Sequence, residues 1–142
     1  LVLRNPMATR PWQHVLEPVT GYILLAQKLG QNQGVFSEAW NFGPEENDCW
    51  SVGKIVTRVC DITQKGSWDT PVIDQPHEAS LLKLDSSKAK ARLGWMPRWN
   101  VSEALRKTIE WYRKSLSGDD MYEFSMMQIM EYQAGSEFNE RE

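Results

Sequence analysis

The stretch Leu3–Pro18, with the sequence LRNPMATRPWQHVLEP, decides the fold of this chain. It places a cation, proline residues, an aromatic ring and an imidazole in one turn-rich block, and an apolar pattern with helical spacing follows directly behind it. Because proline fixes its own backbone angle, a guanidinium held beside Pro11 would lose little freedom on binding a carboxylate or phosphate. Arg10 is therefore either a ligand-binding residue or an ordinary surface arginine where a strand turns into a helix.

Helical periodicity is the main secondary-structure signal in the rest of the chain. Ser51, Asn100 and Asp120 are predicted N-terminal caps, and Asn100 forms a capping box with Glu103. Gly30 and Gly94 mark predicted helix ends. The predicted helices cover residues 18–29, 52–62, 86–93, 101–116 and a last stretch behind Asp120.

Strands are predicted to be few and short. The candidates are residues 1–3, 38–42 and 68–73, the last confined to a sheet edge by Pro71. The fold class is therefore α/β, a small mixed fragment that is mostly helical. A native domain seldom begins in the middle of a strand, so we expect a truncation before Leu1.

Length and composition limit the classes of function. The 142 residues fit one domain, which we place at residues 1–134, followed by a flexible polar tail at 135–142. A net charge of −3 gives no basic footprint for nucleic acid. The longest apolar run, Tyr22–Ala26, is far too short for a membrane span, and no signal sequence precedes it. We expect a cytoplasmic protein.

Several conspicuous side chains have structural interpretations. Cys49 and Cys60 form no CxxC pair and lack the nearby ligands that a zinc site needs, so we expect free thiols. We expect His14 to orient its loop through a hydrogen bond, and Trp12 to brace Arg10. A solvated face is expected for the basic edge around residues 83–92, made up of Lys83, Lys88, Lys90 and Arg92.

The block RNPMATRPWQHVLEP resembles the CDP-glucose 4,6-dehydratases, members of the extended short-chain dehydrogenase/reductase superfamily. Further matching stretches follow in the same order, at residues 38–44, 76–79, 82–85, 87–90 and 93–95. The resemblance runs from the first residue to about Tyr132. It covers only the carboxyl-terminal, substrate-binding part of such an enzyme.

The resemblance implies that the parent enzyme converts CDP-glucose to CDP-4-keto-6-deoxyglucose with NAD. This chain has neither the glycine-rich dinucleotide fingerprint nor the Tyr-x-x-x-Lys of the superfamily, so the fragment alone is expected to bind no cofactor and to be inactive. Its expected partners are CDP-glucose, the missing Rossmann half and a second copy in a homodimer. The alternatives are a related nucleotide-sugar epimerase or dehydratase, and a stand-alone binding or assembly module.

Five residues are candidate substrate contacts under the resemblance. Arg10 corresponds to an arginine on the pyrophosphate, and Asn41 lies where relatives place a polar group on the nucleotide. Gln75 replaces an arginine that contacts phosphate in relatives, which weakens that role. Glu78, with His77 beside it, would accept hydrogen bonds from ribose. The plainer alternatives are a turn residue at Asn41 and solvated loop side chains at His77 and Glu78.

Overall fold

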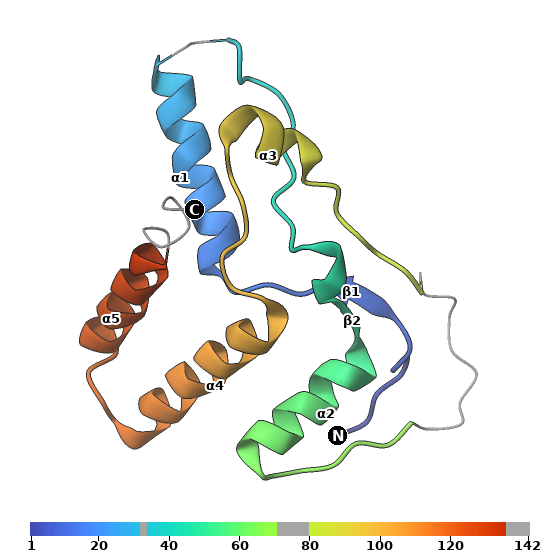
Figure 1. The fold of residues 1–142 in the computed structure, drawn as a ribbon. Coiled ribbons are helices and arrows are strands. Elements are labelled where there is room, and N and C mark those ends of the chain that lie inside the picture. Colours follow the sequence, from blue (N-terminus) through green and yellow to red (C-terminus); the bar gives the residue numbers. More distant parts are fainter. Residues whose placement is uncertain (32–33, 71–79, 136–142) are drawn as a thin grey trace.

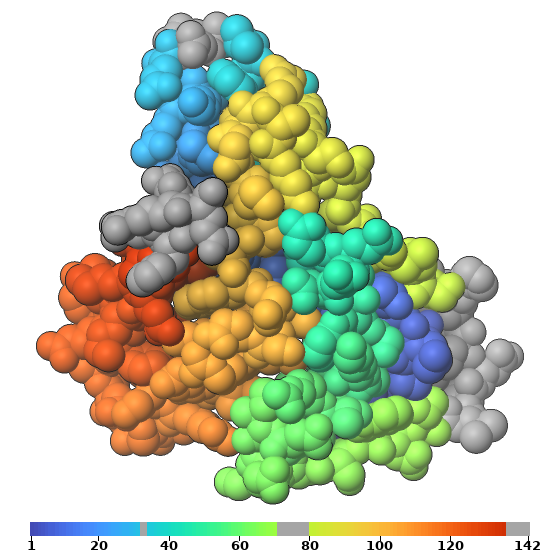
Figure 2. All heavy atoms as spheres, viewed as in Figure 1, coloured from blue at the N-terminus to red at the C-terminus, as the bar shows by residue number. Residues whose placement is uncertain are grey.

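The computed structural model describes residues 1–31, 34–70 and 80–135. Within these ranges it contains five α-helices and a two-stranded sheet, so the predicted α/β class with few short strands is confirmed. The elements are β1 Thr9–Pro11, α1 Leu16–Gln31, β2 Cys49–Ser51, α2 Val52–Thr63, α3 Ser87–Leu93, α4 Val101–Ser117 and α5 Met121–Ala134. Figure 1 shows α1 and α3 packed together above a wider part formed by α2, α4 and α5, and Figure 2 shows the same division in the molecular surface.

The sheet is built on the block that opens the chain. β1 pairs with β2 in antiparallel register, and Arg10 lies opposite Trp50. A parallel bridge joins Thr9 to Leu81 on the other edge of β1, where the Thr9 amide donates to the Ser80 carbonyl at 2.8 Å. β1 is therefore the central strand of this small mixed arrangement.

The predicted helix caps are confirmed. The Ser51 hydroxyl accepts from the Lys54 amide, and Asp120 accepts from the amide of Tyr122 at 2.9 Å. Asn100 accepts from the Glu103 amide at 3.0 Å. Only half of the predicted capping box forms at Asn100, because the Glu103 carboxylate instead pairs with Arg106 on the next turn.

The strand predictions outside the block are less accurate. Residues 38–42 form no strand, and within the described residues no other strand pairs with them. Their backbone is anchored by side chains instead, because the Phe42 carbonyl accepts from Gln13 Nε2 at 2.9 Å and the Ala39 carbonyl accepts from Lys88 Nζ at 2.7 Å. Residues 1–3 contribute only the isolated bridge from Val2 to Asp69. Residues 71–73 of the third predicted strand lie outside the described ranges, as do residues 136–142 of the predicted tail.

The core lies between α1, α3 and the extended stretch before β2. Phe42 and Trp95 meet edge to face with ring centroids 5.1 Å apart, and Ala89 and Leu93 of α3 complete the buried cluster. α1 approaches this cluster through Gly21, where an added Cβ would come within 2.4 Å of the Phe42 ring. Glycine is therefore required at this point of α1 by packing.

Candidate functional site

Arg10 lies on β1, where the backbone on both sides is held. The opposing strand residue is Trp50, and the Trp12 indole N–H donates to the Trp50 carbonyl at 2.9 Å. Trp12 therefore fastens the strand next to Arg10 to its neighbour, which is the bracing role predicted for it. The Arg10 side chain is half-buried, and its Nη1 donates to the Thr9 carbonyl at 2.9 Å.

Two further side chains join Arg10 on this part of the sheet. Directly opposed residues of an antiparallel pair point to the same face, so Arg10 and Trp50 are neighbours. The Lys54 ammonium lies 3.5 Å from the centroid of the Trp50 ring. One face thus carries two cations around an indole, a combination suited to an anionic ligand with a flat ring. Sequence reasoning missed Trp50 and Lys54, because strand register places Trp50 opposite Arg10 and Lys54 reaches the Trp50 ring from α2.

The other predicted contacts are placed only in part. Asn41 is exposed, and its Nδ2 donates to the Asp85 carbonyl at 3.3 Å, which ties the stretch before β2 to the start of α3. Neither of the two cavities described below is lined by Arg10 or Asn41. Gln75, His77 and Glu78 lie outside the described residues.

The basic edge around α3 is neutralised by carboxylates. Lys88 and Arg92 both pair with Glu38, and the Lys90 ammonium lies 2.6 Å from a Glu45 oxygen. The hydrogen bond from Lys88 is the largest cause that lowers the pKa of Glu38, ahead of the effects of Arg92. These ion pairs agree with the solvated face predicted for the basic edge. Because the cations of that edge are paired with carboxylates, Arg10 is a stronger candidate for a phosphate contact than they are.

A cavity of about 380 Å³ lies beside this edge. Its lining combines acidic and basic side chains with Cys49, whose thiol is free. Burial raises the pKa of that thiol, so Cys49 is protonated at neutral pH. Cys60 is also free, as predicted. Among the described residues no group of three His, Cys, Asp or Glu side chains could hold a metal ion.

Among residues 1–31, 34–70 and 80–135, the most deeply buried charged side chain is one that sequence reasoning missed. The Glu17 side chain is 0% exposed, and its carboxylate accepts from the amides of Arg98 at 3.0 Å and Trp99 at 2.8 Å. The Tyr132 hydroxyl also donates to it, at 2.6 Å. Burial, followed by this bond to Glu17, raises the pKa of Tyr132. Glu17 therefore joins the start of α1 to the turn before α4 and to the end of α5.

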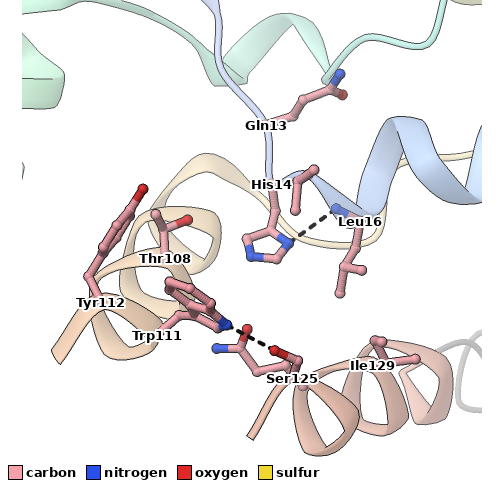
Figure 3. Close-up of a pocket in the computed structure, with 10 residues that line it drawn as sticks. Gln13, His14, Leu16, Thr108, Trp111, Tyr112, Ser125 and Ile129 are labelled. Atoms are coloured by element: carbon pink, nitrogen blue, oxygen red, sulfur yellow. Dashed lines mark hydrogen bonds between the residues drawn. The ribbon is translucent and has the colours of Figure 1, made fainter. Parts of the chain in front are cut away.

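His14 has the orienting role predicted for it. Its Nδ1 accepts from the Leu16 amide at 3.3 Å, at the first residue of α1, and its ring meets the edge of Trp99 with centroids 4.9 Å apart. Burial, and then the charge of Lys107, lower the pKa of His14. Figure 3 shows the imidazole hanging from the block toward α4 and α5.

The helices of the described residues include none with the length and apolar character needed to cross a membrane.

Comparison with known proteins shows which proteins this chain is similar to in sequence. No family model matches the chain. UDP-glucuronic acid decarboxylase 1 of Xenopus tropicalis is 30% identical over 108 residues, covering 76% of this chain and 24% of that protein. UDP-glucose 4-epimerase 2 of Oryza sativa subsp. japonica is 26% identical over 119 residues, covering 81% of this chain and 28% of that protein. The chain is therefore similar to members of the nucleotide-sugar dehydratase and epimerase family.

Within this family the predicted resemblance to CDP-glucose 4,6-dehydratase is confirmed. The protein of that name from Salmonella typhimurium strain LT2 is 42% identical over 137 residues, which is 96% of this chain. The chain spans 38% of the length of that relative. The resemblance therefore extends over nearly all of the chain and over little more than a third of the relative.

Proposed function

We propose that this chain is the CDP-sugar-binding, carboxyl-terminal part of a CDP-glucose 4,6-dehydratase. The observation that carries this proposal is the 42% identity to the Salmonella protein over 137 residues. The decarboxylase and epimerase relatives match at 30% and 26%. The proposed parent converts CDP-glucose to CDP-4-keto-6-deoxyglucose and serves deoxysugar and O-antigen biosynthesis in the cytoplasm.

The proposed task of this part is to hold the nucleotide sugar through Arg10. A planar guanidinium can donate two parallel hydrogen bonds to a pyrophosphate, and its strand is fastened by Trp12. Lys54 and Trp50 support this assignment, because they add a second cation and a ring next to Arg10. Holding the sugar in one pose lowers the entropic part of a reaction barrier. We propose four secondary contacts to the nucleotide sugar, made by Asn41, Gln75, His77 and Glu78.

The residues of this chain do not provide a binding site for NAD. The sequence lacks the glycine-rich turn that brings a backbone close to a dinucleotide pyrophosphate. We therefore assign NAD to the remainder of the parent enzyme and propose no cofactor and no turnover for this chain alone. Exposed apolar side chains on α1 and α5, among them Tyr22, Ile23 and Met130, support the proposal that the remainder of the enzyme or a second copy covers them.

A turnover assay on the natural polypeptide that contains this chain tests the proposal. CDP-, UDP-, GDP- and dTDP-glucose are supplied separately, and mass spectrometry follows the loss of one water from each. We expect CDP-glucose to give the highest kcat/KM. Preference for another nucleotide would instead support a different member of the family. Absence of dehydration with all four sugars would support a non-enzymatic binding or assembly module.

A further inference from the structure

A groove that none of the predicted site residues lines lies between the end of the opening block and the helix pair α4 and α5 (Figure 3). Its volume is about 430 Å³, within the range of small-molecule sites. The groove is lined by Gln13, His14, Val15, Leu16, Thr108, Trp111, Tyr112, Ser125, Gln128 and Ile129. None of these side chains carries a carboxylate, an ammonium or a guanidinium group, so the groove offers no charge of its own to an ionic ligand.

His14 supplies a hydrogen-bond donor to this groove. Its side chain is 6% exposed, and Nδ1 is already the acceptor for the Leu16 amide. In the neutral imidazole the proton is then on Nε2. Nε2 makes no hydrogen bond to any described residue, and Figure 3 shows the ring lying between Leu16 and Trp111. Nε2 is not among the fully buried, unpartnered side-chain atoms of the described residues, so it is accessible from the groove, where a ligand can accept from it.

Gln128 supplies an acceptor from the opposite wall. It is 5% exposed, and its Nε2 donates to the Lys107 carbonyl at 3.0 Å. This bond leaves Oε1 with no donor among the described residues. One groove therefore holds a donor and an acceptor, each on a side chain that is more than nine-tenths buried.

Aromatic side chains form the rest of the wall. The rings of Trp111 and Tyr112 meet edge to face at 5.4 Å. The Trp111 indole is fixed by its hydrogen bond to the Ser125 hydroxyl at 3.0 Å, so it presents a rigid surface. Rigid aromatic walls favour flat rings, which gain contact area without ordering the protein further.

We propose that this groove binds a small neutral cyclic amide, with the ligand carbonyl accepting from His14, its N–H donating to Gln128, and its ring packed on Trp111 and Tyr112. Pyrimidine bases belong to this chemical class. The proposal concerns a different part of the molecule from Arg10 and does not rest on the proposed function.

The test titrates 2-pyridone against the protein and follows the Trp111 indole N–H by NMR. N-methyl-2-pyridone is the matched probe, since it keeps the carbonyl and lacks the N–H. We expect 2-pyridone to bind about two- to tenfold more tightly, which corresponds to one net hydrogen bond. Gln128→Met should remove that difference, whereas Tyr122→Phe, at a residue outside the groove, should preserve it.

The probe comparison needs no variant, so it remains decisive if Gln128→Met fails to fold. Equal affinity for the two probes, or no change at Trp111 with 2-pyridone at its solubility limit, would overturn the proposal. Uracil and uridine 5′-monophosphate separate a free base from a nucleotide. The uncharged groove predicts tighter binding of uracil, and preference for the nucleotide would contradict it.

Discussion

The two halves of LRNPMATRPWQHVLEP differ in what surrounds their charged residues. Arg10, in the first half, is half-buried on the surface of β1 beside Trp50. Glu17, in the second half, is fully buried and accepts three hydrogen bonds from other parts of the fold. This single stretch therefore contains a residue that assembles the fold and a residue that we propose to contact a ligand. Family resemblance alone does not separate these two roles, whereas burial and partners do.

Replacing Glu17 should have the largest effect on stability. Glu17→Ala leaves the buried Tyr132 hydroxyl and the amides of Arg98 and Trp99 without their acceptor, and we expect a loss of about 3–5 kcal/mol in the free energy of unfolding. Urea denaturation measures it. Glu123→Gln, at an exposed site in the first turn of α5, is the control and should cost no more than about 1 kcal/mol, the usual value of a carboxylate in that turn. A Glu17→Ala protein as stable as the control would contradict the assigned role.

Replacing Gly21, one turn after Glu17 on α1, should have the next largest effect on stability. An alanine at Gly21 would press on the Phe42 ring, and overpacking of this kind costs about 1–3 kcal/mol. Gly30→Ala is the matched control, because nothing lies within 4 Å of an added Cβ there. It should stabilise the helix by up to about 1 kcal/mol. Thermal denaturation of both variants tests the contrast, and equal shifts would show that α1 does not approach Phe42 closely.

His14 should make stability depend on pH. Its pKa is lowered in the folded protein, chiefly by burial, so the unfolded chain binds a proton more readily. The free energy of unfolding should therefore fall as the pH drops below about 6.5, by at most about 1.4 kcal/mol per pH unit for this one group. Denaturation curves across this range should be flatter for His14→Gln. If the free energy of unfolding changed with pH equally in the wild type and His14→Gln, His14 would not be the cause of the pH dependence.

Replacing Arg10 should have the smallest effect on stability. Its side chain is only half-buried, and the ladder between β1 and β2 is formed by backbone atoms. We expect Arg10→Ala to shift the denaturation midpoint far less than Glu17→Ala does. A loss comparable to that of Glu17→Ala would make Arg10 a structural residue, and the contrast between the two halves of the block would disappear.

Local signals in the sequence located the helices, although α1 begins at Leu16 and runs through the predicted stop Gly30 to Gln31. Ser51, Asn100 and Asp120 cap the elements that they were predicted to cap, because capping depends only on residues within one turn. Residues 38–42 were predicted as a strand from their apolar composition. Strand formation also needs a neighbouring strand, which the described residues do not supply.

The candidate site required information that spacing does not carry. The register of β1 and β2 places Trp50 opposite Arg10, and Lys54 of α2 lies over the Trp50 ring. Glu17 meets its partners through contacts between α1, the turn before α4 and the end of α5. In sequence, Glu17 looks like an acidic residue in the first turn of a helix, a position where carboxylates are usually exposed and favourable.

The most direct test of the central claim is the affinity of the natural polypeptide containing this chain for CDP, measured by calorimetry with and without Arg10→Ala. Cytidine, which lacks the pyrophosphate, is the ligand control, and Arg58→Ala at an exposed position on α2 is the protein control. We predict that Arg10→Ala weakens CDP binding by about ten- to a hundredfold and leaves cytidine binding unchanged, as expected for lost charge-assisted hydrogen bonds. Equal CDP affinity in the wild type and Arg10→Ala would contradict the account.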